Sequence, residues 1–341
     1  MKKIIALCMT LMLSLSMLCA CGSNSSKSES TTAGSESNAS SDLKVAAIFS
    51  GPINDGSWNE SQYNGLKKIE EAGATINYLE NIGDADSAEG ARAYAAEGYD
   101  LIYLTTNSYQ DYCTSVASEY PDTKFVQING TVMTENFISV KIADEQQGFV
   151  QGVIAALLSE TGKVGFVGGM EINPIILGSS GFAQGVEYAN KTYGLNVTAT
   201  RVNTGDFTDV NKAKETAIAM IDAGADVIAP MVDDASSGVL EAAEEKQLTA
   251  VGSGAGQESF APTALMTAVI KDVAVAYDAT FSQLQAGTLK GEVDGEVEVV
   301  GAADGAIVLA DWADGVDADI QEKAADVLAK IASGEITVKA E

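Results

Sequence analysis

The sequence predicts an α/β protein of two similar lobes, each a mostly parallel sheet flanked by helices, with a hinge between them. From Lys44 onward, short β-branched runs alternate with amphipathic stretches of helical length. This alternation is typical of parallel sheets covered by helices. The pattern restarts near Glu145, which indicates a second unit of the same plan. The 341 residues are enough for two domains of ordinary size.

The first lobe is predicted from residue 43, where apolar runs of strand length are separated by helical stretches. The expected strands are 45–49, 75–79, 101–104, 125–128 and 137–142. Helices are expected to begin near Ser57 and near Asp86, and a third is expected at 108–119. Ser57 and Glu60 have the spacing of a capping box, in which each side chain satisfies a free backbone N–H. The loop 50–57 before this helix is therefore expected to be well ordered.

The second lobe repeats the plan, and the C-terminal tail is expected to complete both lobes. Helices are expected at 145–160, 181–191, 208–223 and 236–246, and strands at 163–167, 196–202, 226–230 and 249–251. In the tail, strand 265–270 and helix 272–284 are expected in the first lobe, and strands 297–300 and 306–310 with helix 319–331 in the second. The predicted domains are 43–142 with 268–290, and 143–267 with 291–341. Several chain crossings then predict a hinge.

The N-terminus has the pattern of an export signal. Lys2 and Lys3 precede an apolar stretch at 4–18 that is too short to span a bilayer, which predicts a signal peptide at 1–20. The segment Leu-Cys-Ala-Cys that ends at Cys21 resembles the lipobox of bacterial lipoproteins, which implies that Cys21 is lipidated and anchors the chain outside the cytoplasm. The alternative is that the protein is secreted without a lipid anchor and that Cys21 is not modified. The polar stretch 21–42 is interpreted as a flexible tether.

Composition disfavours several classes of function. The formal net charge of −28 opposes binding to nucleic acid. The chain has no histidine, which excludes Ser-His-Asp and Cys-His catalysis, and one cysteine beyond residue 21, Cys113, which excludes a Cys/His zinc site. We therefore predict neither catalytic residues nor a metal or other cofactor. Pairs of carboxylates keep a carboxylate-dependent hydrolase open as an alternative.

The loops that follow the predicted strands hold the candidate ligand-binding residues, because ligands bind beyond the carboxyl ends of strands in open α/β sheets. Aromatic, amide and acidic side chains there suit a polar ligand with a flat apolar part. Trp58 and Phe207 come from opposite lobes, so they are expected to sandwich a planar ring; alternatively each packs as a core residue at a helix start. Asp55, Asp233, Asp234 and Lys271 could each bind the ligand through a hydrogen bond. The alternatives are that Asp55 is a turn residue, that Asp233 and Asp234 cap the next helix, and that Lys271 is a surface lysine. The predicted site residues are Asn54, Asp55, Ser57, Trp58, Asn59, Asn107, Asn129, Gly169, Met170, Phe207, Asp233, Gln257 and Lys271.

An ordered set of motifs gives the chain a specific resemblance. The opening stretch 50–59 (SGPINDGSWN) with 63–66 (YNGL) resembles the start of the basic membrane protein family of substrate-binding lipoproteins. Further segments follow in the family's order: 97–102 (EGYDLI), 120–122 (YPD), 162–169 (GKVGFVGG), 181–185 (GFAQG) and 223–228 (AGADVI). The resemblance runs from about residue 44 to past residue 310. It implies a type I periplasmic-binding fold, an ABC importer permease as partner, and purine nucleosides as ligands.

The resemblance also assigns residues. Trp58 and Phe207 stand where the family stacks the base, Asn54, Asp55 and Asn59 match polar first-loop positions, and Lys271 matches a lysine that contacts ribose. The family often carries an Asp where this chain has Asn129, and acidic residues in the stretch 253–257 (SGAGQ), so base preference is expected to shift.

From this resemblance we expect a monomer that closes its lobes over the ligand. A sensory lipoprotein, or a sugar or amino-acid binder on the same fold, is the alternative.

Overall fold

The computed structural model describes residues 43–341 except 294. The signal peptide predicted at 1–20, the tether at 21–42 and the lipid acceptor Cys21 lie outside these residues. Two six-stranded sheets form the core of the described chain, and all strand pairs are parallel except one. This arrangement confirms the predicted fold class.

The first sheet has the strand order β11-β5-β4-β3-β1-β2. Its strands are β1 (Lys44–Ile48), β2 (Thr75–Leu79), β3 (Leu101–Leu104), β4 (Lys124–Ile128), β5 (Phe137–Ile142) and β11 (Glu298–Val300). Both faces of the sheet are buried, because in β1 Val45 and Ala47 belong to one apolar cluster and Ala46 and Ile48 to another. Strands buried on both faces have continuous apolar runs, which is the pattern seen in the sequence.

The second sheet has the order β12-β10-β9-β8-β6-β7. Its strands are β6 (Lys163–Gly168), β7 (Thr198–Asn203), β8 (Val227–Met231), β9 (Thr249–Gly252), β10 (Leu265–Lys271) and β12 (Ile307–Leu309). β12 runs antiparallel to β10 and closes this edge.

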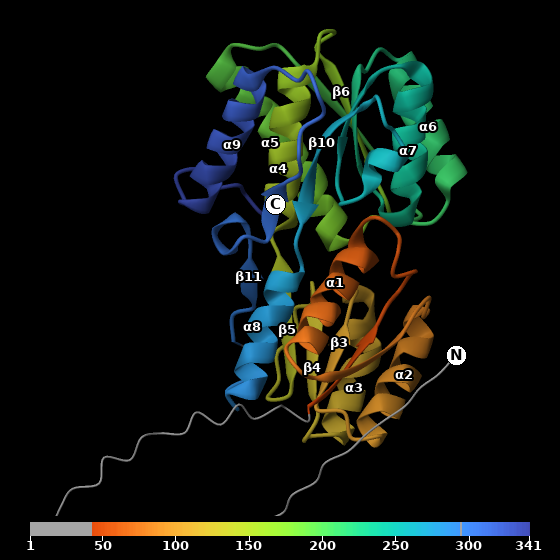
Figure 1. Ribbon diagram of the computed structural model, residues 1–341, viewed down its shortest axis with the longest axis vertical. Helices are drawn as coiled ribbons and strands as arrows, with labels where there is room; N and C mark the ends of the chain where they lie inside the picture. The colour runs from red at the N-terminus through yellow and green to blue at the C-terminus, as the bar shows by residue number, and fades with distance from the viewer. Residues whose placement is uncertain (1–42, 294) are drawn as a thin grey trace, which may run out of the picture. The chain divides into compact units, whose positions relative to one another are not determined.

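Figure 1 shows the helices grouped around the two sheets. The helices are α1 (Trp58–Glu71), α2 (Asp84–Ala96), α3 (Gln110–Glu119), α4 (Asp144–Leu158), α5 (Asn173–Tyr193), α6 (Val210–Asp222), α7 (Ser236–Lys246), α8 (Ala274–Gln285) and α9 (Ala318–Ala332). α8 packs on α1 in the first lobe and α9 on α4 in the second, the lobes in which the sequence predicts these two helices. α5 begins eight residues before its predicted start, because Pro174 in its first turn fits the helix. Within the described part of the chain, no helix combines the length and apolar character needed to cross a bilayer.

Two strands of the tail were assigned to the wrong lobe. β10 pairs with β9 and so belongs to the second sheet, whereas the sequence placed this strand in the first lobe. β11 pairs with β5 in the first sheet, whereas it was expected in the second. A short apolar run predicts a strand, but it does not say which sheet edge the strand extends. Helices α8 and α9, in contrast, lie in the predicted lobes.

The chain crosses between the lobes three times, at residues 142–144, 271–274 and 300–302. Backbone hydrogen bonds join the first crossing to the third, and the second crossing to the residue before β12. The Ala143 N–H donates to the Val300 carbonyl at 3.0 Å, and the Asp272 N–H to the Ala306 carbonyl at 2.8 Å. The predicted crossings are therefore present, and the hinge motion that they were expected to allow stays a prediction.

Helices α4 and α5 approach so closely that glycine is required between them. A Cβ at Gly152 would lie 2.1 Å from the Phe182 carbonyl oxygen, and one at Gly148 would lie 1.9 Å from the Gly178 carbonyl oxygen. From α5, a Cβ at Gly185 would lie 2.0 Å from the Phe149 carbonyl oxygen. This contact fixes α4, whose first turn leads out of the hinge.

Gly152→Ala is expected to lower the free energy of unfolding by about 2–3 kcal/mol, because the new methyl group forces the two helices apart. Helix propensity alone predicts the opposite sign, since Ala stabilises a helix interior by about 1 kcal/mol relative to Gly. Urea denaturation measures the change. Ala219→Gly at an exposed position of α6 is the control, and it should follow propensity with a loss of about 1 kcal/mol. An increase in stability in Gly152→Ala would contradict this packing.

Candidate functional site

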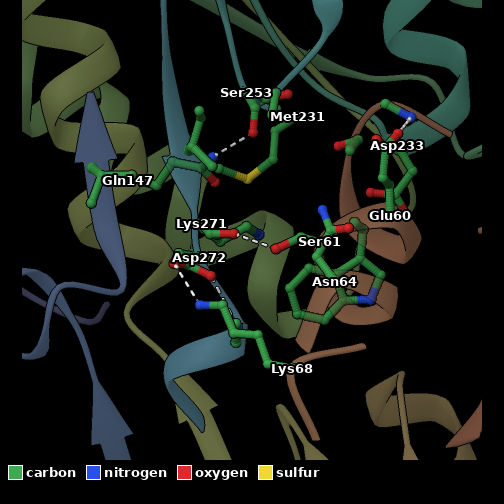
Figure 2. Close-up of a pocket in the computed structure, with 18 residues that line it drawn as sticks. Glu60, Ser61, Asn64, Lys68, Gln147, Met231, Asp233, Ser253, Lys271 and Asp272 are labelled. Atoms are coloured by element: carbon green, nitrogen blue, oxygen red, sulfur yellow. Dashed lines mark hydrogen bonds and ion pairs between the residues drawn. The ribbon is translucent and has the colours of Figure 1, made fainter. Parts of the chain in front are cut away.

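Two cavities lie between the lobes and share three lining residues. The hinge cavity has a volume of about 340 Å³ and the aromatic cavity about 150 Å³. Trp58, Asp233 and Lys271 line both. Figure 2 shows the hinge cavity, which Met231 and Ser253 reach from the second lobe. Together the cavities have the size of an ordinary small-molecule site.

The aromatic cavity brings Trp58 and Phe207 together from opposite lobes. Its lining residues are Ser50, Trp58, Asp84, Thr106, Asn107, Ser108, Asn129, Met170, Ile172, Pro174, Ile175, Phe207, Asp233 and Lys271. Both aromatic rings are half-buried and also pack against the core. The two interpretations made from the sequence, core packing and cavity lining, therefore both describe these residues.

Trp58 is held in place from two sides. Its indole Nε1 donates to the Thr105 carbonyl at 2.9 Å, at the end of β3. The Lys271 ammonium lies 4.7 Å from the centre of the ring, a cation–π contact from the second hinge crossing. The ring is thus oriented before any ligand arrives.

The loop before α1 is ordered by Asp55, not by the predicted capping box. The Asp55 carboxylate accepts hydrogen bonds from the backbone N–H groups of Ser57, Asn59 and Glu60 at 2.9–3.0 Å. The Ser57 side chain makes no capping bond, and Glu60 accepts from the Gly56 N–H instead. The capping-box prediction was wrong because the charged carboxylate two residues earlier is a stronger acceptor for the same free N–H groups.

Five predicted site residues line neither cavity. Asn54 is exposed, and the carboxylate of Asp55 is used within its own loop. Asn59 is buried and bonds to Asp55 and to the Gly51 N–H. Gly169 lies under the Phe207 ring, where a Cβ would be 2.1 Å from a ring carbon. Gln257 is buried and its side-chain oxygen accepts from the Ser253 and Gly254 N–H groups.

Phe207 is positioned by a tight turn at the end of β7. The Asp206 carboxylate accepts hydrogen bonds from the Thr208 and Asp209 N–H groups at 2.7 and 3.1 Å, which lowers the pKa of Asp206. The Phe207 carbonyl in turn accepts from the Ala235 N–H at 2.9 Å. The loop after β7 is therefore joined to the loop after β8, which carries Asp233.

A buried ion pair links two of the hinge crossings. The Lys271 ammonium lies 2.7 Å from one carboxylate oxygen of Asp144, and their side chains are only 13% and 2% exposed. The Asn129 side-chain N–H donates to the other oxygen at 3.2 Å, and its own oxygen accepts from the Ile142 N–H at 2.8 Å. Asn129 thus clamps the first crossing, and its backbone φ of 58° is one that Asn tolerates.

Asn129→Asp is expected to reduce stability at pH 8 by about 2 kcal/mol, because two carboxylates would then face each other in a buried site. Their repulsion raises the pKa of one of them above its value in the unfolded chain. The deficit is therefore present at high pH and shrinks as the pH falls and that group takes up a proton. Urea denaturation at pH 8 and pH 5 measures it. Adding Asp144→Asn to the variant should remove most of the pH dependence, and an unchanged profile would contradict the clamp.

Eight of the predicted residues do line the cavities: Ser57, Trp58, Asn107, Asn129, Met170, Phe207, Asp233 and Lys271. The ligand role of each predicted residue stays a prediction. The sequence reasoning missed the hinge cavity, whose other lining residues include Glu60, Ser61, Asn64, Lys68, Gln147, Met231, Ser253 and Asp272. A signal existed for Gln147, because Gln147 and Gln151 lie one turn apart in an otherwise mostly apolar helix. Their side-chain N–H groups donate to carbonyls of the second sheet, which leaves the Gln147 oxygen buried without a partner in the described chain.

The described residues contain no cluster of three or more side chains that suits a metal ion. The arrangement is instead suited to binding: two aromatic faces, several amides and carboxylates, and walls that come from both lobes.

The chain matches one family model and is similar to several relatives and solved structures. A family model described as ABC transporter substrate-binding protein, PnrA-like, matches residues 42–341. The chain is 27% identical over 307 residues to a purine-binding protein from Brucella abortus, which covers 89% of this chain and 85% of that protein. It is 28% identical over 255 residues to basic membrane protein A1 from Borrelia garinii, covering 73% and 74%. An ABC transporter solute-binding protein from Conexibacter woesei has a similar structure, with a TM-score of 0.73 at 25% identity, covering 87% of this chain and 99% of that one.

Proposed function

Because the chain belongs to the family of PnrA-like ABC transporter substrate-binding proteins, we propose that it delivers a purine nucleoside to an ABC importer outside the cytoplasm. It binds the ligand between its lobes and releases it unchanged. Lipidation of Cys21 holds it at the membrane next to the permease, and it acts as a monomer.

One observation carries the ligand class: Trp58 and Phe207, from opposite lobes, line the same cavity. Two aromatic faces on either side of a gap favour a planar guest, at about 0.5–1.5 kcal/mol per aromatic contact beyond the area that is buried. A sugar alone would leave these faces without a flat partner. The similarity to a purine-binding protein supports a purine as that guest.

The same geometry supports a closing motion. Each lobe contributes one aromatic ring, so the ligand makes its full set of contacts only when the lobes are together. A ligand shifts a conformational equilibrium only through such a difference in affinity. The three linked hinge crossings allow the lobes to open and close about a common axis.

Isothermal calorimetry against adenosine, guanosine, inosine, free bases, ribose and glucose tests the proposal. We expect at least one purine nucleoside to bind in the micromolar range or tighter and the sugars not to bind. Small-angle scattering should then detect compaction with that nucleoside. Binding of sugars alone would refute the purine ligand, and turnover of a nucleoside by the purified protein would refute a pure binding role.

A further inference from the structure

One carboxylate in the cleft lacks the partners that the neighbouring acids have. Asp233 receives no side-chain hydrogen bond or ion pair from the residues that the structure describes. The other acidic side chains that line the two cavities have partners: Glu60 accepts from the Gly56 N–H, Asp84 from the Ser108 hydroxyl and Asp272 from the Ala274 N–H. Asp55 and Asp144 are also paired, Asp55 with N–H groups of its own loop and Asp144 with Lys271 and Asn129. Asp233 is half-buried and its side chain lines both cavities, so this carboxylate is available to a ligand.

The position of Asp233 supports that role. It follows β8 and opens a short 3-10 turn, Asp233–Ala235, with a backbone φ of 45°. This left-handed conformation is unfavourable for most residues other than glycine. The hydrogen bond from the Ala235 N–H to the Phe207 carbonyl holds the turn. The side chain is thereby fixed where it lines both cavities, beside the two aromatic residues.

Among residues 43–341 other than 294, no lysine or arginine forms an ion pair with Asp233. Lys271, which lines both cavities, is paired with Asp144 at 2.7 Å. Lys68 is half exposed and lies 3.9 Å from Asp272. The pKa of Asp233 is raised to about 7, mainly because the carboxylate is buried. The negative charges of Asp55, Asp144 and Asp234 raise this pKa further, and the positive charge of Lys271 lowers it. Glu60, in the wall of the hinge cavity, adds a further negative charge.

We propose that Asp233 sets the charge class of the ligand, so that for one ring system the cleft prefers a cation to a neutral molecule and rejects an anion such as a phosphate ester. This inference rests on the proposed function, because it concerns the ligand of the same cleft. A cationic or N–H-bearing group next to Asp233 gains a charge-assisted hydrogen bond in a poorly solvated site. A phosphate there meets like charge, and the two described lysines that line the cavities, Lys271 and Lys68, already lie near Asp144 and Asp272.

Three ligands with one ring system test the proposal: 5′-amino-5′-deoxyadenosine as cation, adenosine as the neutral form and AMP as anion. At pH 8 we expect wild type to bind the cation roughly tenfold more tightly than adenosine, and AMP roughly a hundredfold more weakly. In Asp233→Asn these differences should shrink by roughly tenfold. Asn tolerates the same backbone conformation, so the variant should fold, as a thermal melt will verify.

Asp234→Asn is the matched control. It removes the same charge from the next residue, whose side chain lines neither cavity, and should leave the charge preference within about twofold of wild type.

The pH dependence gives a second readout. The ionised carboxylate attracts the cation, so its advantage should be close to full at pH 8 and fall by up to about tenfold between pH 8 and pH 5, as Asp233 is protonated. Asp233→Asn should show no such fall. Equal affinities for the cation and AMP in wild type, or a preference that Asp233→Asn leaves intact, would overturn the proposal.

A second ligand pair separates this inference from the purine assignment. If no adenosine derivative binds, the purine assignment fails, and tryptamine with indole-3-acetate, a planar cation and a planar anion, decides the question of charge. Binding of tryptamine alone, weakened in Asp233→Asn, supports the inference. Binding of both equally, or of neither, overturns it.

Discussion

Trp58→Ala is expected to weaken ligand binding by about two orders of magnitude, or about 3 kcal/mol. The indole supplies one face of the aromatic cavity, and its loss removes about 100 Å² of apolar contact together with the stacking contribution. It also removes the ring on which the Lys271 ammonium rests. Calorimetry with the nucleoside that wild type binds most tightly measures the effect.

Two further variants locate the effect at this ring. Trp58→Phe keeps an aromatic face but loses the hydrogen bond to the Thr105 carbonyl, so its affinity should fall by less than about tenfold. Trp312→Ala removes the other tryptophan, which lines neither cavity, and should leave affinity unchanged. A Trp58→Ala protein that is folded and binds like wild type would place the ligand elsewhere.

Lys271→Met is expected to lower the free energy of unfolding by about 3–5 kcal/mol at pH 8, because it leaves the Asp144 carboxylate buried without its cation. Burial raises the pKa of Asp144, and Lys271 is the main influence in the opposite direction. Without Lys271, Asp144 keeps its proton to a higher pH. The deficit is thus largest at high pH and shrinks as the pH falls. Urea denaturation at pH 8 and pH 5 measures both parts.

The controls for this variant separate burial from charge. Lys68→Met removes an exposed lysine whose nearest carboxylates lie at 3.9 and 4.0 Å, and should change stability by less than about 0.5 kcal/mol. The double variant Lys271→Met with Asp144→Asn should regain most of the lost stability, since no buried charge remains. If Lys271→Met and Lys68→Met lose equal stability, the buried pair has no special part in the hinge.

The sequence predicts which loops, at the ends of strands, form the candidate site, but it does not predict which side chains in these loops face the cavities. Trp58 and Phe207 were predicted to face one cleft because each follows a strand of its own sheet, and both line the aromatic cavity. Asp55 was harder to interpret, since an acidic side chain after a strand serves equally well to order its own loop. Which role it takes depends on the direction of the side chain, and that direction is set by contacts that a residue pattern does not contain.

The tail of the chain illustrates the same limit at the level of the fold. The strands at β10 and β11 were predicted in sequence, yet each joins the opposite sheet from the one expected. Local residue patterns determine whether a segment forms a strand or a helix. Which sheet a strand joins depends instead on which sheet edge still lacks a neighbouring strand. The pair of Lys271 and Asp144 shares this property, because 127 positions separate the two residues and neither has a local signal for the other.

The three crossings also determine how much of the chain must be present before the protein can finish folding. The first sheet needs β11 to cover the edge of β5, and α1 needs α8 beside it, yet both arrive only after the second lobe has begun to form. Neither lobe is therefore a continuous stretch that can be completed by itself. A chain shorter than about 300 residues keeps an open strand edge at β5, and one that ends before α8 also leaves a face of α1 uncovered, so the final compact state is postponed until almost all of the polypeptide is available.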